Sequence, residues 1–356
     1  MIRLMLVDDS SFMRTLVKNL VTKGTDIEVV AEAKNGEEAI ELFSDQIDVV
    51  MLDIEMPKKT GLEVLKEWQN RNVKVPVIMF SSLTKNGARE TIQALGLGAF
   101  DFIEKPNNPI LLNQKRDEIL EKIQLAYKKN SKSSKNIKTA SDTIKPNNLV
   151  ISGRPKTMKE IERPRFSGRK NLILIGCSTG GVKALNKIIP MFPKNLNGAI
   201  IIVQHMPTGS YIRTLSESLN RTSELVIHEA KDGQKIMNGN VYMAPGGHQI
   251  KINAAGEIVV NDDAAESGHA PSVDYMFREV LKENKDFNLI PVVLTGMGGD
   301  GSKSSLLMSE KGIETIVESE ESCIVFGMPR KVIEIGAKYS SHHLEDIPAY
   351  IMKKMK

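Results

Sequence analysis

The stretch from 171 to 185, which reads Asn-Leu-Ile-Leu-Ile-Gly-Cys-Ser-Thr-Gly-Gly-Val-Lys-Ala-Leu, restricts the fold of this chain more than any other segment. It opens with a short apolar run of β-rich type, which predicts a buried strand. Glycines then break the run, and a helical pattern follows as far as Pro190. A strand, a glycine turn and a helix in this order indicate an α/β fold and place Ser178 at the sharpest point of the bend.

The turn itself, Gly-Cys-Ser-Thr-Gly from 176 to 180, matches the G-x-S-x-G nucleophile elbow, which lifts a hydroxyl above the edge of a sheet. A glycine-rich phosphate loop and an ordinary tight turn are alternatives that the motif alone leaves open, because such patterns often match by chance. Cys177 is a second candidate nucleophile. Adjacent residues that leave a strand point apart, so only one of Cys177 and Ser178 can face a base on another strand.

A base for Ser178, and a group that orients this base, are available at the ends of later apolar runs. The run from 199 to 203 has the near-continuous apolar sequence of a strand buried on both faces and leads to His205. The run from 289 to 295 leads into a glycine-rich turn that contains Asp300. Because the carboxyl ends of parallel strands share one edge of a sheet, we expect these residues to form a Ser-His-Asp triad.

Each member of this triad also has an ordinary structural interpretation: a helix cap, a histidine with satisfied hydrogen bonds, or an aspartate in a turn. Their joint placement at strand ends favours the triad over three unrelated structural roles. The chain order Ser, His, Asp differs from the order Ser, Asp, His of the α/β-hydrolases, so that fold is a poor match despite the elbow.

Six sequence blocks accompany these residues: Gly-Cys-Ser-Thr-Gly-Gly (176–181), Gln-His-Met-Pro (204–207), Ala-Pro-Gly-Gly-His (244–248), Pro-Ser-Val-Asp (271–274), Leu-Thr-Gly-Met-Gly-Gly-Asp-Gly (294–301) and Val-Phe-Gly-Met-Pro-Arg (325–330). In this order they closely resemble the signature blocks of the chemotaxis protein-glutamate methylesterases. The resemblance implies an enzyme that hydrolyses γ-glutamyl methyl esters on the cytoplasmic domains of methyl-accepting chemoreceptors. It also implies deamidation of certain receptor glutamines by the same acyl-transfer chemistry.

The resemblance further implies a role for each residue of the site. Ser178 attacks the carbonyl carbon, His205 takes and returns the proton, and Asp300 orients the imidazole. The backbone N–H of Met297, with Thr179 beside the nucleophile, would stabilise the negative charge that develops on the carbonyl oxygen. No cofactor is expected in this catalytic domain, which we expect to be a doubly wound, largely parallel α/β structure.

The front third of the chain alternates strands and helices, which predicts a doubly wound (βα)5 domain. Helices are expected over 10–20 and 36–43. The expected strands end in polar side chains and cover the segments 3–9, 27–33, 48–53, 75–81 and 99–106.

Acidic residues lie at the ends of two of these strands: Asp8 and Asp9 end the first, and Asp53 ends the third. Three carboxylates at one sheet edge repel one another unless a cation lies between them. Oxygen ligands around open positions suit Mg²⁺, which keeps water molecules and accepts a phosphoryl oxygen. With Ser81 and Lys105 at the ends of two further strands, the pattern predicts phosphoryl transfer to a carboxylate. The alternative is a set of solvated turn acids.

This arrangement resembles the receiver domain of two-component response regulators. The resemblance implies that a chemotaxis histidine kinase is the phosphodonor. It also implies a set of site residues: Asp53 as phosphoacceptor, Asp8, Asp9, Asp53 and the backbone carbonyl of Glu55 as Mg²⁺ ligands, Ser81 on the phosphoryl oxygens, Lys105 paired with the phosphate, and Phe102 as the switch aromatic. A response regulator whose rear domain only binds a partner or a nucleotide is the competing function, and the complete triad argues against it.

The presence of both halves on one chain suggests how phosphorylation controls the enzyme. A tethered receiver domain is at high effective concentration near the catalytic edge, so even a weak contact can cover Ser178. Phosphorylation of Asp53 is expected to draw in Ser81 and to reposition Phe102, which would weaken such a cover and activate the esterase.

The segment from 127 to 170 separates the two halves and contains 13 Lys and Arg against 3 Asp and Glu. Its net charge of +10 leaves −6 for the rest of the chain, whose total is +4. The segment cannot bury enough apolar surface to fold alone, so we expect a solvated tether and no nucleic-acid partner. The expected parts are a receiver domain over 1–122, a flexible basic linker over 123–168 and a catalytic domain over 169–356.

The two cysteines, Cys177 and Cys323, form no pair motif, which is typical of a reducing cytoplasm. No apolar run reaches the length of a membrane span, and the start lacks the pattern of a signal peptide. We therefore expect a cytoplasmic protein without membrane insertion.

Three places depart from the family patterns. The segment 58–61, Lys-Lys-Thr-Gly, lacks the Asp that receiver domains commonly carry before this glycine, which should alter only loop detail. Ala270 stands where many methylesterases have Arg, and Glu318 where they often have Gln. The last two could affect how receptor segments are held, or the activity, without touching the triad.

Overall fold

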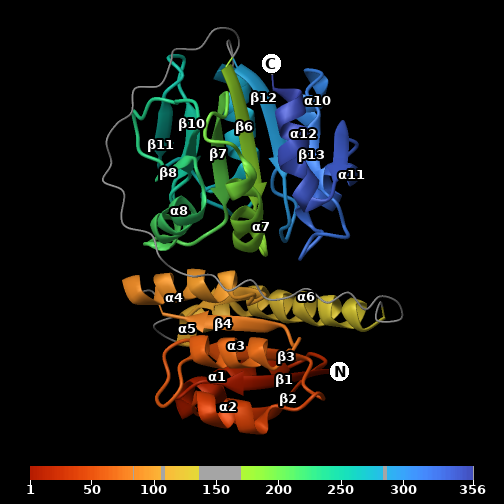
Figure 1. The fold of residues 1–356 in the computed structure, drawn as a ribbon. Coiled ribbons are helices and arrows are strands. Elements are labelled where there is room, and N and C mark those ends of the chain that lie inside the picture. The colour runs from red at the N-terminus through yellow and green to blue at the C-terminus, as the bar shows by residue number, and fades with distance from the viewer. Residues whose placement is uncertain (83, 106–108, 136–169, 284–286, 356) are drawn as a thin grey trace.

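Five parallel strands form the sheet of the front domain, in the order β2-β1-β3-β4-β5 (Figure 1). The computed structural model describes residues 1–356 except 83, 106–108, 136–169, 284–286 and 356. The strands confirm the expected (βα)5 pattern, and their bounds are β1 (Ile2–Val7), β2 (Ile27–Ala33), β3 (Val49–Asp53), β4 (Val77–Ser81) and β5 (Asp101–Glu104).

The front helices begin where local capping signals stand in the sequence. The side-chain oxygens of Ser10, Asn35, Thr60 and Thr84 each accept a backbone N–H from the first turn of the helix that follows. The helices are α1 (Ser11–Thr22), α2 (Gly36–Leu42), α3 (Gly61–Asn70), α4 (Lys85–Gly96), α5 (Pro109–Gln114) and α6 (Arg116–Lys135).

Helix α6 continues to Lys135 and so includes the first part of the segment 123–168 that was expected as a linker. Ile119, Ile123 and Ala126 recur at helical spacing on α6 and are fully buried in the core of the front domain. This apolar stripe outweighs the basic composition that suggested a tether. Residues 136–168 lie outside the described residues, and the outer bounds of the expected domains stay predictions.

Seven parallel strands form the sheet of the rear domain, in the order β14-β13-β12-β6-β7-β9-β8. The strands are β6 (Lys170–Cys177), β7 (Gly198–Gln204), β8 (Val226–Glu229), β9 (Asn240–Met243), β12 (Phe287–Val293), β13 (Thr315–Glu318) and β14 (Tyr339–His342). An antiparallel hairpin of β10 (Gln249–Ile252) and β11 (Ile258–Asn261) lies apart from this sheet. The sheet confirms the expected parallel α/β class.

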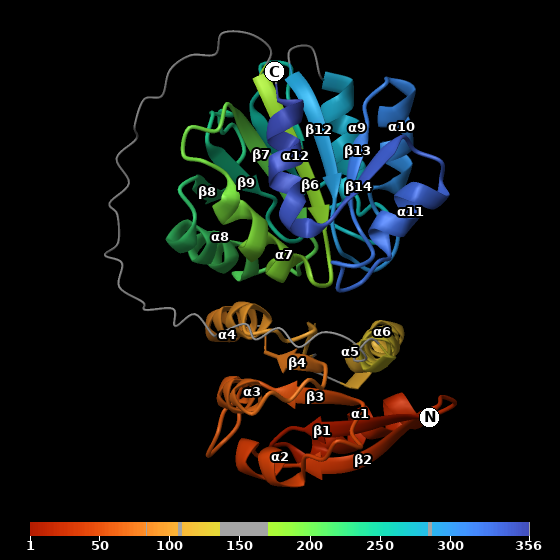
Figure 2. The ribbon, with the colours of Figure 1, turned by 45° about the vertical axis from the view of Figure 1, so that its right-hand side comes forward.

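Helices cover both faces of the rear sheet, and the period of two along a strand explains which side chains meet them. On β6, Ile173 and Ile175 pack toward α7, α8 and α12, whereas Leu172 and Leu174 pack toward α9, α10 and α11 (Figure 2). The helices are α7 (Gly181–Ile188), α8 (Tyr211–Thr222), α9 (Val273–Glu283), α10 (Ser302–Glu310), α11 (Met328–Glu334) and α12 (Ile347–Lys354), with 3₁₀ turns η1 (Ile189–Met191) and η2 (Leu344–Asp346).

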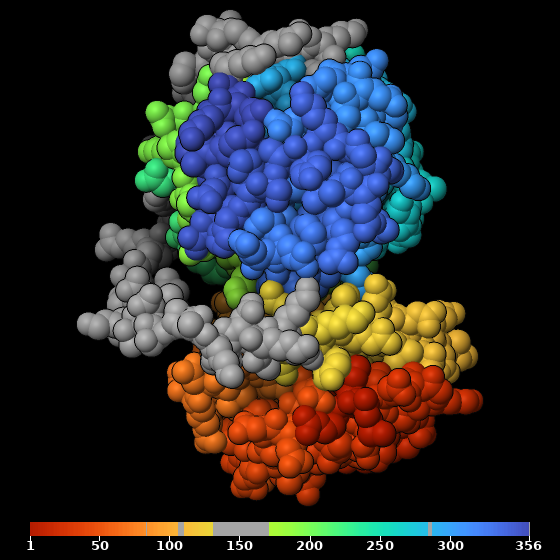
Figure 3. Space-filling view, turned by 90° about the vertical axis from the view of Figure 1, so that its right-hand side faces the viewer, coloured from red at the N-terminus to blue at the C-terminus, as the bar shows by residue number. Residues whose placement is uncertain are grey.

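The front domain lies against the carboxyl edge of the rear sheet, with α4 and α6 nearest to it (Figures 1 and 2). The ring of Phe102 on β5 stacks on Tyr211 of α8 with centroids 5.3 Å apart. Figure 3 shows from the side that α6 and the rear domain touch over this edge. The receiver-like face and the edge expected to carry the triad are therefore packed together.

None of the helices that the structure describes has the length and apolar character of a membrane span.

Candidate active site and phosphoacceptor site

Ser178 lies at the bend between β6 and α7, as the strand-glycine-helix pattern predicts. Its N–H donates to the carbonyl of Thr295 at 3.1 Å, and its carbonyl accepts from Gly181 N at 2.8 Å and from Gln204 Nε2 at 3.1 Å. Gly180, at the cap of α7, has a φ of +83°, a left-handed conformation that glycine adopts without strain. Both backbone groups of Ser178 are thus fixed, and its hydroxyl makes no hydrogen bond with any described residue.

The glycine-rich turn after β12 approaches Ser178 so closely that a side chain at Gly296 would not fit. A Cβ atom at this position would lie 2.9 Å from Ser178 Cβ and 2.2 Å from Met328 Sδ. Within the described residues, the N–H of the following Met297 donates no hydrogen bond. The turn therefore brings an available backbone donor close to the serine, and its role toward an oxyanion stays a prediction.

His205, which follows β7, and Asp300, which follows β12, are brought together at the same sheet edge. His205 Nε2 lies 2.8 Å from Asp300 Oδ2. His205 Nδ1 is buried and has no hydrogen-bond partner among the described residues. The imidazole therefore keeps one nitrogen on the carboxylate and leaves Nδ1 as the nitrogen that can serve as a base.

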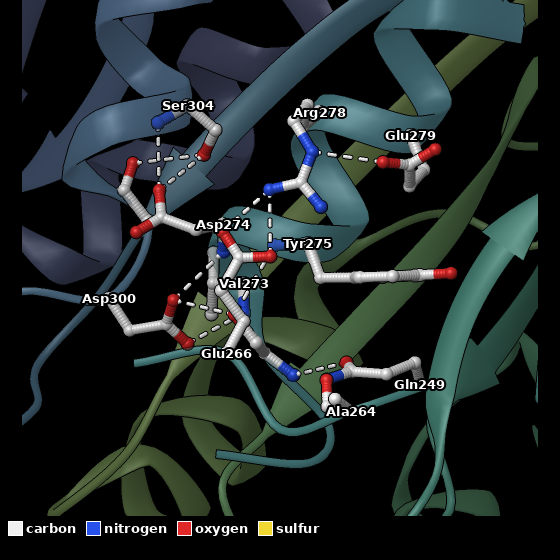
Figure 4. Close-up of polar contacts among 12 residues, drawn as sticks. Gln249, Ala264, Glu266, Val273, Asp274, Tyr275, Arg278, Glu279, Asp300 and Ser304 are labelled. Atoms are coloured by element: carbon white, nitrogen blue, oxygen red, sulfur yellow. Dashed lines mark hydrogen bonds and ion pairs between the residues drawn. The ribbon is translucent and has the colours of Figure 1, made fainter. Parts of the chain in front are cut away.

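Asp300 is held by donors besides His205, most of them at the beginning of α9 (Figure 4). Ser272 Oγ donates to Oδ1 at 2.8 Å, Val273 N to Oδ2 at 2.7 Å and Asp274 N to Oδ1 at 2.9 Å. Burial would raise the pKa of Asp300, but the hydrogen bond and charge of His205, together with the backbone donors, lower it to about 2. The carboxylate is therefore ionised and fixed in orientation at neutral pH.

A second buried carboxylate supports the first. Asp274 Oδ1 accepts from Ser304 N and from Ser304 Oγ, both at 2.7 Å, which ties α9 to α10 (Figure 4). Burial, together with the charge of Asp300, raises the pKa of Asp274. Arg278 Nη1 donates to Glu266 Oε2 at 2.7 Å and fixes the loop before α9. These contacts hold the N-terminus of α9, and hence Asp300, in place.

Sequence reasoning missed two supporting residues of this site. Ser272 and Gln204 lie in blocks used for the family resemblance, yet no role was predicted for either. Ser272 Oγ accepts from Tyr275 N at 3.2 Å while donating to Asp300, so it serves both the helix end and the acid. A serine directly before the helical pattern was the available signal for Ser272. Gln204 directly precedes His205, and nothing local marked its contact with Ser178.

The remaining loop histidines differ in their relation to the site. The ring of His269 stacks on that of His205 with centroids 3.9 Å apart and planes 16° apart. Burial and the charge of His205 lower the pKa of His269 to about 4. His248 instead pairs with Asp262 at 2.6 Å on the surface. His269 is thus a neutral neighbour of the base at neutral pH, whereas His248 lies in an unrelated surface pair.

Cys177, the alternative nucleophile, faces the protein interior. Its side chain is fully buried, and Sγ donates to Gln204 Oε1 at 3.1 Å. Burial raises the pKa of this thiol, which disfavours the reactive thiolate. Ser178, next in the chain, is partly exposed at the sheet edge.

The front domain brings Asp8, Asp9 and Asp53 together, so that one ligand atom of each lies within 4.8 Å of the others. Lys105 Nζ is 2.7 Å from Asp8 Oδ2 and 2.7 Å from Asp53 Oδ2. Burial raises the pKa of Asp53 to about 6, against the opposing charge of Lys105. Burial lowers the pKa of Lys105, but the two carboxylates outweigh it and raise the pKa overall. A further cation at this cluster would reduce the electrostatic repulsion among the three carboxylates.

Lys105 contacts Asp53, whereas the predicted switch residues Ser81 and Phe102 are engaged in other contacts. Ser81 Oγ accepts from Thr91 Oγ1 of α4 at 2.6 Å, and Phe102 lies against Tyr211 of the rear domain. Burial, with the charge of Glu104, raises the pKa of Tyr211 to about 12, so the phenol is neutral. For Glu55, the contact seen with Asp53 is its own N–H, which donates to Oδ1 at 3.3 Å.

The two sites meet across the domain interface. Thr179 Oγ1 donates to Asp101 Oδ2 at 2.6 Å, directly beside the candidate nucleophile. Lys122 Nζ of α6 donates to the carbonyl of Phe102 at 2.6 Å and lies 3.4 Å from Asp101 Oδ2. Lys129, also on α6, donates to the carbonyl of Cys323 at 2.6 Å. The front domain therefore forms hydrogen bonds with the rim of the candidate active site.

Comparison with known proteins divides the chain in the same way. The protein-family model described as CheB methylesterase matches residues 173–351. The family model described as response regulator receiver domain matches residues 4–116. A Bacillus subtilis protein named protein-glutamate methylesterase/protein-glutamine glutaminase is 40% identical, and the match covers 100% of this chain and 99% of that protein. A Thermotoga maritima protein of the same name is 39% identical over 98% of this chain and 96% of that protein.

Two solved structures from Thermotoga maritima each correspond to one half. The CheB methylesterase catalytic domain is 36% identical in sequence, with a TM-score of 0.49. This match covers 53% of the present chain and 100% of the solved one. The response regulator domain of CheB is 44% identical in sequence, with a TM-score of 0.32. This match covers 36% of the present chain and 96% of the solved one.

Proposed function

The chain belongs to the protein-glutamate methylesterase/protein-glutamine glutaminase family with a response regulator receiver domain, and on this premise we propose that its Ser178, His205 and Asp300 hydrolyse glutamate methyl esters of chemoreceptors. Deamidation of receptor glutamines follows from the same chemistry. The observation that carries the proposal is the 2.8 Å contact of His205 Nε2 with the buried Asp300, at the edge where β6 delivers Ser178.

The proposed reaction is an acyl transfer in two stages. His205 Nδ1 takes the proton of Ser178 Oγ as this oxygen attacks the ester carbonyl, and the imidazolium then protonates the departing methoxide. Water next hydrolyses the acyl-serine with His205 again as base, which releases glutamate. Asp300 stabilises the imidazolium throughout. With a glutamine substrate, the leaving group is ammonia instead of methanol.

Negative charge develops on the carbonyl oxygen and needs fixed donors. The proposed donor is the N–H of Met297, on the turn that Gly296 allows to approach Ser178. Thr179 lies beside the nucleophile, and its side chain is engaged by Asp101 of the front domain. Full access of a receptor segment to this side of the site therefore requires the domains to separate.

The front domain is proposed to bind Mg²⁺ through Asp8, Asp9, Asp53 and the carbonyl of Glu55. The residues fit this ion, because three carboxylates cluster there with Lys105 as the cation that pairs with two of them. The ion would neutralise charge on the phosphoryl group. Asp53 accepts that group from a chemotaxis histidine kinase, and Lys105 and Ser81 bind its oxygens.

Phosphorylation is proposed to activate the esterase by weakening the interface. Ser81 must leave Thr91 to reach a phosphoryl group on Asp53, and Phe102 must leave its stacked position on Tyr211. Both changes remove contacts next to Asp101 and Thr179. We place the protein in the cytoplasm, where the kinase and the receptor segments are available, with no membrane insertion and no nucleic-acid partner.

Turnover of a simple carboxylic ester by the full-length chain tests the enzymatic claim against a function in binding alone. The proposal expects turnover that rises with a small-molecule phosphodonor and is abolished by Ser178→Ala. Equal turnover by the Ser178→Ala variant would show that this serine is not the nucleophile. Absence of turnover with and without phosphodonor would favour a rear domain that only binds a partner.

A further inference from the structure

Glu318 is a buried acid that the proposed reaction does not use. Glu318 is the last residue of β13 and is completely inaccessible to solvent. It therefore cannot hold a receptor segment directly. Its Oε2 accepts the N–H of Thr295 at 2.8 Å. Its Oε1 has no hydrogen-bond partner among the described residues. A buried carboxyl with one engaged oxygen calls for an explanation beyond packing.

Thr295 connects this acid to the nucleophile. Its carbonyl accepts the N–H of Ser178 at 3.1 Å. Its hydroxyl donates to the carbonyl of Thr179 at 2.9 Å and accepts from Val325 N at 2.9 Å. Glu318 thus fixes a residue that bonds both to the backbone of the Ser178–Thr179 turn and to the loop at Val325.

Burial favours the neutral form of Glu318, whereas its hydrogen-bond contacts favour the ionised form. No Lys, Arg or His within the described residues forms an ion pair with it, and Ser322 and Cys323 are the side chains in contact with the carboxyl. Cys177 and His343 are the further titratable groups that interact with this acid electrostatically. Lys129 reaches the carbonyl of Cys323, not the acid. Burial outweighs these contacts and raises the pKa of Glu318.

We propose that Glu318 is a positioning residue of the esterase: as a neutral acid it holds Thr295, and through Thr295 the Ser178–Thr179 turn, and its ionisation loosens that turn at alkaline pH. An ionised carboxylate at this position would be buried without a paired charge, which the surrounding structure can relieve only by moving. The inference rests on the proposed function of Ser178, and it adds an alkaline limit to activity that the triad alone does not impose.

Two substitutions separate the hydrogen bond from the charge. Glu318→Gln keeps the acceptor for Thr295 N and cannot ionise, whereas Glu318→Leu removes the acceptor at similar size. Glu314→Gln is the matched control, because Glu314 precedes the other end of β13 and pairs with Lys354 at the surface. The full-length chain is used throughout, with phosphodonor present.

Two readouts are measured between neutral and alkaline pH. The first is kcat and KM for methanol release from methylated receptor membranes. The second is the rate at which phenylmethylsulfonyl fluoride labels Ser178, which needs no receptor. We expect both kcat and labelling to fall at alkaline pH in the wild type and in Glu314→Gln, and to stay level in Glu318→Gln. Glu318→Leu should have a kcat about tenfold below that of Glu318→Gln at every pH, as for one lost hydrogen bond, with KM nearly unchanged.

An alkaline fall of labelling in Glu318→Gln equal to that of the wild type would overturn the proposal. So would a Glu318→Leu variant with wild-type kcat. If the leucine variant does not fold, the comparison of Glu318→Gln with Glu314→Gln still decides. If no receptor methanol is released by any variant but the labelling profiles behave as expected, the substrate assignment fails while the role of Glu318 stands.

Discussion

The hydroxyl of Thr179 donates a 2.6 Å hydrogen bond to Asp101 of the receiver domain, and Thr179 is the residue next to the proposed nucleophile. Asp101 is itself held by Lys122 and by the N–H of Phe102, which donates to its Oδ1 at 2.8 Å. The resting receiver domain therefore places a fixed carboxylate at the rim of the site that receptor segments must enter.

Asp101→Asn should raise esterase activity in the absence of phosphodonor. The amide keeps the size of the side chain but loses its charge, so its bond with Thr179 and its pairing with Lys122 both weaken. A domain coupling of about 1–3 kcal/mol corresponds to roughly 5- to 150-fold activation, and we expect the low end from this single change. The measurement is turnover of a simple ester by the unphosphorylated full-length chain.

Glu32→Gln is the control for this variant, because Glu32 pairs with Lys18 on the surface of the receiver domain away from the interface. Its resting activity should equal that of the wild type. An Asp101→Asn variant that is no more active than Glu32→Gln would show that the contact with Thr179 does not restrain the enzyme.

Phosphorylation should act through Asp53 alone. Acetyl phosphate with Mg²⁺ is expected to raise esterase activity, Asp53→Asn to abolish the rise, and a chelator to abolish it in the wild type, because the carboxylate cluster needs the cation to receive another anion. The check is turnover with and without phosphodonor. Activation of Asp53→Asn to the wild-type level would place the phosphoacceptor elsewhere.

The members of the triad should behave as one unit. Ser178→Ala and His205→Ala should each reduce turnover by roughly 10⁴-fold or more, and the double variant should be little worse than either. Steady-state kinetics on the three variants measures this. Losses that multiply in the double variant would mean that His205 does not serve Ser178 as its base.

Asp300 should contribute to stability as well as to catalysis. Asp300 accepts from Ser272, Val273 and Asp274 as well as from His205. Asp300→Ala would therefore leave four donors unpaired, and Asp300→Asn is the cleaner test. We expect the asparagine variant to fold and to keep more activity than Ser178→Ala, since Asp300 only orients the base.

The pH dependence of stability gives an independent check on Asp300. Its pKa is lowered from 3.8 to about 2 in the folded protein, so its ionised form stabilises the fold by about 2 kcal/mol above pH 3.8. This contribution is lost as the pH falls through about 2. Denaturant unfolding between acidic and neutral pH should show the dependence in the wild type and a weaker one in Asp300→Asn. Identical profiles would show that the pair with His205 is not formed.

The apolar runs predicted the central strands well because these strands are parallel and buried on both faces. The run that ends before Gly176 became β6. Ile27–Ala33 became β2 with its expected bounds, although this edge strand is partly exposed. Residues at the carboxyl ends of such strands must share one edge, so the meeting of His205 with Asp300, and of Asp53 with Lys105, could be predicted from order alone.

The parts that sequence reasoning missed depend on contacts between distant segments. No local pattern indicates that Gln204 holds Ser178, that Glu318 holds Thr295, or that Asp101 reaches Thr179. Helix α6 extends into the segment expected as a linker, and its apolar stripe is buried in the core of the front domain. Glu318, read from sequence as a residue that could affect receptor binding, is buried in the domain behind the nucleophile.

The central claim is tested most directly by incubating the full-length chain with methylated receptor membranes and measuring released methanol. We predict methanol release by the wild type, a rise on addition of acetyl phosphate and Mg²⁺, and none above background with Ser178→Ala. Release by Ser178→Ala at the wild-type rate, or no release by a folded and phosphorylated wild type, would contradict the account.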